Sequence, residues 1–238
     1  MNAPAPQKVA IITGASQGIG AGLVAGFRAA GYAVVGTARS MAPSDDPGYL
    51  TVAGDIAEPA TCESVLAAAL ERFGRVDTLV NNAGVYLGKP FTDCSVEDFE
   101  TIVAVNLGGF FHITQRAIRQ MVEQRTGHVV NISTSLVDDA DRDRPCALTV
   151  LTKGGLAAVA RSLAIEYASR GVRVNAVSLG VIRTPAHDES SYAGMAALNP
   201  LGRLGEVSDV VDGVLYLEQA AFVTGEILHI DGGQSAGH

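Results

Sequence analysis

Short apolar runs of four to six residues alternate along the chain with longer segments in which apolar residues recur every three or four positions. The short runs are typical of strands buried on both faces, and the longer segments are typical of amphipathic helices. The predicted strands are Val9–Thr13, Ala33–Thr37, Leu50–Ala53, Val76–Val80, His128–Ile132, Val172–Val177 and Glu226–Ile230.

Helical patterns separate most of these strands. The predicted helices are Gly18–Ala30, Ala60–Phe73, Val96–Gln124, Cys146–Ala168 and Ser208–Glu218, with short helical pieces expected in the loop Gly180–Pro200. Strands joined by helices imply right-handed crossovers and a parallel sheet. We therefore expect one α/β domain over residues 8–238, a doubly wound parallel sheet of about seven strands as in the Rossmann fold, preceded by a flexible tail over residues 1–7.

Composition narrows the function classes. The net charge of −8 argues against a nucleic-acid partner, because nucleic acids are bound by basic surfaces. The three cysteines are widely spaced and form no CxxC pair, which predicts neither a disulfide framework nor a metal site and suits a cytoplasmic protein. The N-terminal residues lack the pattern of a signal peptide, and no run of about 18 apolar residues predicts a membrane span.

The turn after the first predicted strand carries the clearest chemical signal. Thr13 is followed by three glycines in the spacing Gly-x-x-x-Gly-x-Gly, from Gly14 to Gly20, and then by a predicted helix. Such a turn presents backbone N–H groups at a helix N-terminus, which suits the pyrophosphate of a dinucleotide. The alternative is an ordinary strand-to-helix turn that needs glycine for its backbone angles.

Further motifs follow in a fixed order. They are Asp55-Ile56, Asn81-Asn82-Ala83-Gly84, Asn106, Asn131-Ile132-Ser133-Thr134, Lys153, Asn175-Ala176-Val177 and Asp231-Gly232-Gly233. Together with the glycine-rich turn, they identify the chain as resembling the short-chain dehydrogenase/reductase family, of the compact type without added domains, over essentially its whole length. The resemblance implies a nicotinamide dinucleotide at the carboxyl ends of the strands and hydride transfer to or from a small-molecule carbonyl or alcohol.

The resemblance also implies roles for cofactor-binding residues. The phosphate turn would comprise Gly14, Ser16, Gln17, Gly18, Ile19 and Gly20, and the adenine and riboses would meet Asp55, Ile56, Asn82, Ala83, Gly84 and Lys153. Gly180, Ile182 and Thr184 would meet the nicotinamide carboxamide. Some of these residues have other interpretations: Asp55 as a helix N-cap, Lys153 as a solvated helix lysine, and Thr184 as an extended residue before proline.

Arg39, just after the second strand, bears on the choice of cofactor. An arginine there can pair with the 2′-phosphate of NADP, whereas a carboxylate would bind the ribose hydroxyl of NAD. The sequence therefore favours NADP(H) over NAD(H), although Gln17 stands where many NADP-using relatives place a basic residue. The alternative is that Arg39 stacks on the adenine of either cofactor.

The chain departs from the family at the active centre. The family's proton-donating tyrosine stands four residues before the lysine, and that position is Thr149. An aliphatic hydroxyl is a far weaker acid than a phenol. Enoyl reductases of the same superfamily place a tyrosine seven residues before the lysine, where this chain has Cys146, which is also typical of a small buried core residue.

Other positions keep a polar group. The family's active-site serine corresponds to Thr134, whose hydroxyl can still hydrogen-bond a carbonyl oxygen. The residues at catalytic positions are thus Asn106, Thr134, Thr149 and Lys153.

These observations leave two function classes. One is a carbonyl reductase whose proton comes from water, Lys153, the substrate or a surrogate such as Tyr86 or Tyr192. The other is a catalytically silent dinucleotide-binding homologue that acts as a partner subunit or redox sensor.

Assembly is expected from two helices. Val96–Gln124 and Cys146–Ala168 are rich in apolar and small residues, and in this family the corresponding helices commonly pair across a twofold axis. A homodimer or homotetramer is therefore expected through the surface that carries Phe110, Phe111, Leu163 and Tyr167.

Overall fold

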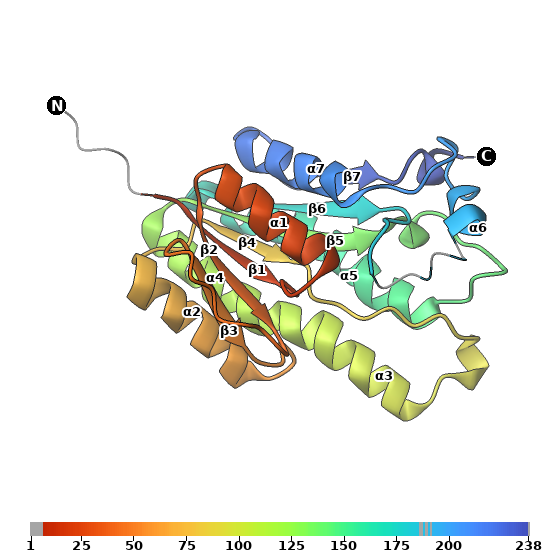
Figure 1. Ribbon diagram of the computed structural model, residues 1–238, viewed down its shortest axis with the longest axis horizontal. Coiled ribbons are helices and arrows are strands. Elements are labelled where there is room, and N and C mark those ends of the chain that lie inside the picture. Colours follow the sequence, from red (N-terminus) through yellow and green to blue (C-terminus); the bar gives the residue numbers. More distant parts are fainter. Residues whose placement is uncertain (1–6, 186–187, 189, 191, 238) are drawn as a thin grey trace.

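The computed structural model describes residues 7–185, 188, 190 and 192–237 and contains one seven-stranded sheet (Figure 1). All of its strand pairs are parallel, and the strand order is β3-β2-β1-β4-β5-β6-β7. The strands are β1 (Val9–Thr13), β2 (Ala33–Ala38), β3 (Tyr49–Ala53), β4 (Thr78–Asn81), β5 (Gly127–Thr134), β6 (Val172–Leu179) and β7 (Ile227–Ile230). The predicted doubly wound α/β fold is confirmed.

Helices cover both faces of this sheet (Figure 1). They are α1 (Gly18–Ala29), α2 (Pro59–Phe73), α3 (Val96–Val103), α4 (Phe110–Gln124), α5 (Ala147–Tyr167), α6 (Tyr192–Ala196) and α7 (Val207–Gln219). Helices α1 and α7 pack against each other on one face, whereas α2 packs on α4, and α5 lies along β5 and β6 on the other. Two apolar clusters fill the spaces between the sheet and its helices.

The alternating periods of the sequence produce these two clusters. In β1, Ile12 points to the α1 side and Ile11 to the α2 side, as successive residues of a strand do. Phe27 of α1 is completely buried and packs edge-on against Tyr32. Burying a side chain of that size contributes about 1.5–3 kcal/mol to the free energy of unfolding, so these contacts stabilise the packing of α1 on the sheet.

The strand order reverses direction at β1. The chain runs from β1 outward to β2 and β3, and then returns to place β4 on the other side of β1. In open parallel sheets such a reversal leaves a crevice at the carboxyl ends of the two neighbouring strands, where ligands bind. The glycine-rich turn after β1 and the Asn-Ala-Gly segment after β4 therefore lie on the two walls of one crevice.

The element boundaries differ in places from those predicted. The fourth strand begins at Thr78 and not at Val76, because the backbone N–H of Val76 bonds the side chain of Gln124 and not a neighbouring strand. The fifth and sixth strands continue further than predicted, to Thr134 and Leu179. Of the predicted tail, residues 1–6 lie outside the described residues, while the Gln7 side chain donates a hydrogen bond to Gly31 O at 2.9 Å.

The long helix predicted over Val96–Gln124 contains an irregular turn. Residues Ala104–Gly109 form one π-helical turn between α3 and α4. Such turns insert an extra residue into the helical repeat and often occur at functional sites. Here the turn contains Asn106, so it changes the direction in which a predicted site residue points.

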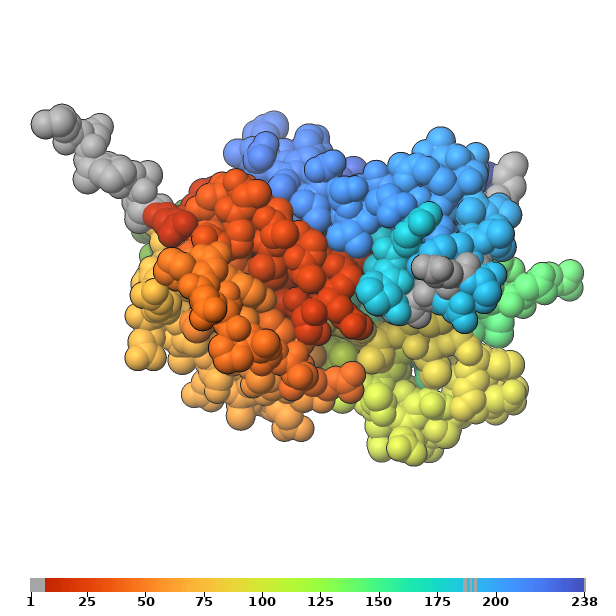
Figure 2. Space-filling view, in the orientation of Figure 1, coloured from red at the N-terminus to blue at the C-terminus, as the bar shows by residue number. Residues whose placement is uncertain are grey.

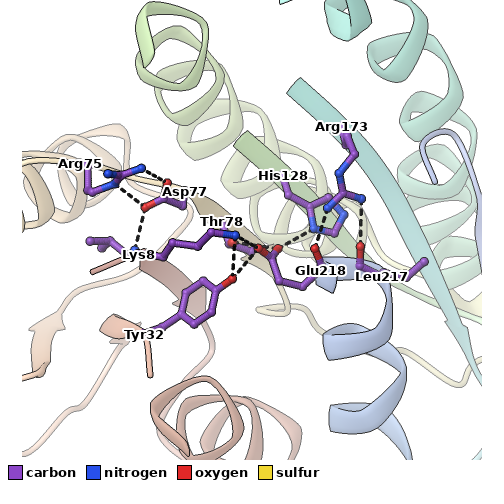
Figure 3. Close-up of polar contacts among 10 residues, drawn as sticks. Lys8, Tyr32, Arg75, Asp77, Thr78, His128, Arg173, Leu217 and Glu218 are labelled. Atoms are coloured by element: carbon purple, nitrogen blue, oxygen red, sulfur yellow. Dashed lines mark hydrogen bonds and ion pairs between the residues drawn. The ribbon is translucent and has the colours of Figure 1, made fainter. Parts of the chain in front are cut away.

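A buried polar cluster lies at the opposite, amino-terminal edge of the sheet (Figure 3). Glu218 of α7 accepts hydrogen bonds from Tyr32 Oη at 2.7 Å and Thr78 Oγ1 at 2.9 Å. It also lies 2.8 Å from His128 Nδ1. These bonds join α7 to β4 and β5 and satisfy a carboxylate that would otherwise be costly to bury.

Candidate active site

The phosphate turn has the backbone shape that its glycines predict. Gly14 and Gly18 have φ angles of +67° and +54°, in the left-handed region that favours glycine. A Cβ on Gly20 would collide with the carbonyl oxygen of Gly14, so a larger residue would separate the turn from the helix. The N-cap residue Gln17 makes no side-chain capping bond, which leaves the first N–H groups of α1 available to an anion.

The segment after β4 is tied to this turn. Thr13 Oγ1 accepts hydrogen bonds from the N–H groups of Asn82 at 3.0 Å and Ala83 at 2.9 Å. The Asn82 amide donates to Thr13 O at 2.8 Å and Gly14 O at 3.2 Å. The Asn82 side chain therefore holds the shape of the phosphate turn, and the cofactor contacts of Asn82, Ala83 and Gly84 stay a prediction.

Asp55 and Ile56, the residues predicted to meet the adenine, differ in their surroundings. Asp55 Oδ1 accepts a hydrogen bond from Ala57 N at 2.9 Å, which closes a local turn. The N-cap of α2 is Glu58, so the alternative interpretation of Asp55 as that N-cap is wrong. Ile56 is buried and belongs to the apolar cluster under α2.

The segment after β6 lies beside the phosphate turn. Thr184 packs against Gly18: a Cβ built on that glycine would lie 3.4 Å from Thr184 Cβ. Ile182 is buried and pairs with Gly205, so it reaches the crevice only through its backbone. Gly180 lies against Asp231, where a Cβ would approach the backbone to 2.7 Å. In Figure 2 the turn after β1 (red), the segment after β4 (yellow) and the segment after β6 (cyan) meet on the face shown.

Arg39 lies exposed directly after β2. The Ala15 N–H donates to Thr37 O at 3.1 Å, so the end of β2 is bonded to the phosphate turn. Within the described part of the chain, Arg39 forms no ion pair with a carboxylate. Its guanidinium is therefore free to meet a phosphate beside the turn.

Lys153 has the properties of a site residue and not of a solvated lysine. Burial lowers the pKa of its ammonium to about 8. Its Nζ atom lies 3.5 Å from Ile132 O, and a Cβ on Gly84 would come within 3.7 Å of it. The ammonium therefore faces the segment after β4 across the crevice.

The side chain of Asn106 is bonded within the protein. Its Oδ1 accepts a hydrogen bond from Val85 N at 2.8 Å, and its Nδ2 donates to Val85 O at 3.1 Å. Nδ2 also donates to Thr152 Oγ1 at 3.0 Å. The side chain is buried and fully engaged, so Asn106 positions the segment after β4 and leaves no side-chain group for a substrate.

Thr149 is likewise engaged. It is completely buried; its Oγ1 accepts a hydrogen bond from Leu87 N at 2.9 Å and donates to Leu87 O at 3.2 Å. A threonine hydroxyl has one proton to donate, and here the backbone receives it. Thr149 therefore fixes the neighbouring segment through Leu87, and its catalytic role stays a prediction.

Thr134 is different from the serines on either side of it. Ser133 Oγ donates to Lys153 O at 3.0 Å and Ser135 Oγ to Gln234 Oε1 at 3.1 Å. Thr134 Oγ1 accepts a hydrogen bond from Leu136 N at 3.4 Å, which leaves its hydroxyl proton available. Thr134 therefore keeps a donor at the carboxyl end of β5.

The hydrogen-bond partners of Asn106 and Thr149 could not be identified from the sequence. Val85 and Leu87 follow the Asn-Ala-Gly motif and are bound through their backbone groups, which no side-chain pattern reveals. Of the predicted residues, the structure brings the phosphate turn, Asn82, Thr184 and Lys153 to one edge of the sheet. No cluster of three or more potential metal-ligating side chains occurs among the described residues.

Comparison with known proteins gives one consistent result. The profile of the family described as Enoyl-(Acyl carrier protein) reductase matches residues 14–235. 3-oxoacyl-(acyl-carrier-protein) reductase FabG of Escherichia coli (strain K12) is 36% identical over 240 residues, covering 95% of this chain and 96% of that protein.

Solved structures show the same relationship. ElxO with NADP bound is similar with a TM-score of 0.91 and 26% identity, covering 97% of this chain and 100% of that chain. 3-ketoacyl-(acyl-carrier-protein) reductase from Brucella melitensis, complexed with NADH, has a TM-score of 0.85 and 31% identity, covering 97% of this chain and 99% of that chain.

Proposed function

The chain belongs to the short-chain dehydrogenase/reductase family of oxidoreductases, and from this premise we propose that it reduces a small carbonyl substrate with NADPH. The observation that carries the proposal is the meeting of three groups at one edge of the sheet. These are the phosphate turn, the Lys153 ammonium and the available hydroxyl of Thr134. A pure binding protein has no need for a free donor at the end of β5.

The bound nicotinamide would supply the hydride, and the chain would supply binding and polarisation. Lys153 would bind the nicotinamide ribose hydroxyls, since its ammonium faces the crevice. Thr134 would donate its free proton in a hydrogen bond to the substrate oxygen as negative charge develops there. The structure offers no corresponding role for Thr149, so the proton that completes the alcohol must come from another group.

For the substrate, we propose a 3-oxoacyl thioester or a similar ketone. This choice rests on two of the similar proteins, which are both named as reductases of 3-oxoacyl or 3-ketoacyl groups on acyl carrier protein. Both names describe the reduction of a ketone.

The preference for NADPH rests on Arg39. Similar proteins hold NADP in one case and NADH in another, so similarity alone does not decide. If the guanidinium pairs with the 2′-phosphate, Arg39→Ala weakens NADPH binding by about 1.5–3 kcal/mol, the range of a charge-assisted hydrogen bond. NADH binding stays within a factor of two, because NADH lacks that phosphate. Fluorescence titration of both cofactors tests this, and equal losses for both would contradict the assignment.

The proposed reaction is tested with the purified full chain. NADPH oxidation is followed at 340 nm with a panel of 3-oxoacyl thioesters, simple ketones and quinones. Substrate-dependent oxidation is expected with at least one ketone. Tight NADPH binding without turnover on any of them would favour the alternative, a silent dinucleotide-binding partner subunit or redox sensor.

A further inference from the structure

Because Thr149 already donates its proton to Leu87 O, the proposed reaction needs a different proton donor. We propose that the phenol of Tyr86 is that donor, delivered from the segment after β4 in place of the tyrosine that the family carries on α5. This inference rests on the proposed reductase function.

The backbone on both sides of Tyr86 is clamped by side chains at family catalytic positions. Asn106 bonds both the N–H and the carbonyl of Val85, and Thr149 bonds both the N–H and the carbonyl of Leu87. The segment is fixed again where Lys89 N donates to the carbonyl oxygen of residue 145 at 2.7 Å. Two of the four positions implied in catalysis thus hold Tyr86 in place.

This clamping places the backbone of Tyr86 near the reacting groups. Gly84 faces the Lys153 ammonium. Tyr86 follows Gly84 by two residues, so the Cα atoms of Gly84 and Tyr86 are at most about 7 Å apart. Thr149, which bonds the next residue, is one helical turn before Lys153 on α5. The backbone of Tyr86 therefore lies beside the same turn of α5 from which the family presents its phenol.

The side chain of Tyr86 is free to act. It is 58% exposed, and no hydrogen bond of its hydroxyl to any described residue is present. The ring lies over Gly88, where a Cβ would come within 3.0 Å of the phenol oxygen. Burial of part of the ring raises the pKa of the phenol, negative charge on the nearby Cys146 would raise it further, and the Arg144 guanidinium opposes this rise. Tyr86 therefore keeps its proton near neutral pH.

Of the other described tyrosines, Tyr49 lies on β3 and Tyr216 on α7, and the remaining three have contacts of their own. Tyr32 bonds Glu218 at the opposite edge of the sheet, and Tyr167 bonds Glu166. The ring of Tyr192 lies beneath Arg183, with the guanidinium carbon 5.1 Å from the ring centroid. Tyr86 is thus the phenol that combines a free hydroxyl with a fixed backbone beside α5.

The step balances without a further reagent. A bound reduced nicotinamide, NADPH in the proposed function, would supply the hydride and would be left oxidised. The hydride adds to the carbonyl carbon, and the C=O π electrons move to the oxygen. The O–H bond of Tyr86 breaks as a new O–H bond forms on that oxygen, which gives the alcohol and a phenolate. Water then returns a proton to the phenolate, as the exposure of the ring allows.

The test compares Tyr86→Phe with Tyr216→Phe in the full chain. Tyr216 lies on α7 and is 57% exposed, so the control removes an equally accessible hydroxyl away from the site. Single-turnover hydride transfer is measured from pH 6 to 10, together with the NADPH dissociation constant and the thermal midpoint. Loss of a general acid lowers the rate by about 10²–10⁴-fold. That loss is expected for Tyr86→Phe, with cofactor affinity and thermal midpoint unchanged, and Tyr216→Phe should match the wild type.

Three results would overturn the inference. The first is wild-type rates in Tyr86→Phe. The second is a comparable loss in Tyr192→Phe but not in Tyr86→Phe. The third is an alkaline fall in rate near pH 8 that persists unchanged in Tyr86→Phe, which would assign the proton to Lys153. If the wild type shows no turnover, the proposed reductase function fails as a whole. Turnover that survives Tyr86→Phe removes only the role of Tyr86.

Discussion

At the scale of single residues, the family position of a side chain does not decide its role; its hydrogen bonds do. Thr149 has one proton and two lone pairs, and Leu87 engages both kinds of group. Thr134 occupies a similar family position at the site, but its bond to Leu136 leaves the proton free. Two threonines at positions implied in catalysis therefore differ in their bonding: the proton of Thr149 is engaged, and that of Thr134 is available.

Replacing Thr149 with valine should destabilise the protein. The valine would leave both backbone groups of Leu87 unpaired at a buried contact. An unsatisfied buried group costs about 1–3 kcal/mol, so the free energy of unfolding should fall by at least that amount in urea titrations. Thr149→Ser keeps the hydroxyl and should lose at most about the 0.8 kcal/mol of one buried methyl.

Activity separates this role from catalysis. Loosening Leu87 should lower turnover in Thr149→Val together with stability, and Thr149→Ser should restore both. If Thr149→Val lost a thousandfold in kcat with unchanged stability and cofactor affinity, Thr149 itself would be the proton donor.

The sequence alone predicts the role of a residue where that role depends on the local backbone conformation. The glycines of the phosphate turn need positive φ angles, and their spacing alone indicates this. The partners of Asn106 and Thr149 could not be predicted, because they are backbone groups 21 and 62 positions away in the chain. The π-helical turn at Asn106 could not be predicted either, because its weak helix formers Asn106, Gly108 and Gly109 do not specify the type of turn.

At the scale of elements, α7 is attached to the sheet by a buried ionisable cluster. Glu218 of α7 bonds His128 of β5, and the ring's other nitrogen lies 3.0 Å from Asn175 Nδ2. Asn175 Oδ1 accepts from Glu226 N, which fixes the amide orientation, so that nitrogen of His128 acts as an acceptor. The imidazole is therefore neutral, with its proton on the side of Glu218. The pair is 90 residues apart in sequence, and no motif predicts it.

This cluster makes stability depend on pH. Burial lowers the pKa of His128 below its usual 6.5, although Glu218 opposes the change. Below pH 6.5 the unfolded chain binds a proton that the folded protein resists. The free energy of unfolding therefore decreases as the pH is lowered, by at most about 1.4 kcal/mol per pH unit for one such group.

Glu218 adds a second loss at lower pH. Burial raises its pKa, but hydrogen bonds from His128, Tyr32 and Thr78 outweigh burial and lower the pKa below its usual 4.5. The stability that Glu218 contributes is therefore present above pH 4.5 and is lost as pH falls below that value.

Urea titrations from pH 7.5 to 5 test the role of His128. His128→Gln should be less stable at pH 7.5 but show a smaller decrease toward pH 5 than the wild type. His229→Gln, at a half-exposed histidine, is the control and should keep the wild-type slope. An unchanged slope in His128→Gln would show that another group is responsible.

At the scale of the whole molecule, α5 has a face that the monomer does not cover. By length and composition, Ala147–Arg170 could cross a membrane, but 39% of its most apolar window is buried against the sheet in the described structure. The exposed remainder forms a stripe of small and apolar residues at helical spacing: Leu151, Gly155, Ala158, Ser162 and Ile165. Small residues let two helices approach closely, so this stripe suits a second helix of the same kind.

Neighbouring α4 extends this face. A hollow of about 520 Å³ between the two helices is lined by Phe110, Phe111, Leu163 and Tyr167 among others. Phe111 is 54% exposed and Ile165 is 81% exposed, whereas large apolar side chains are usually buried. The predicted homodimer or homotetramer would cover these side chains.

The assembly prediction is tested with one charge on this face. Ile165→Glu would place a carboxylate at the centre of the proposed contact, where burying it unpaired costs several kcal/mol. Light scattering at micromolar concentration should give a mass of at least twice the 24.6 kDa chain for the wild type and of one chain for Ile165→Glu. Val96→Glu, at an exposed position on the first turn of α3, should assemble like the wild type. A wild-type protein that is monomeric under these conditions, or an Ile165→Glu variant that assembles normally, would show that this face is not the interface.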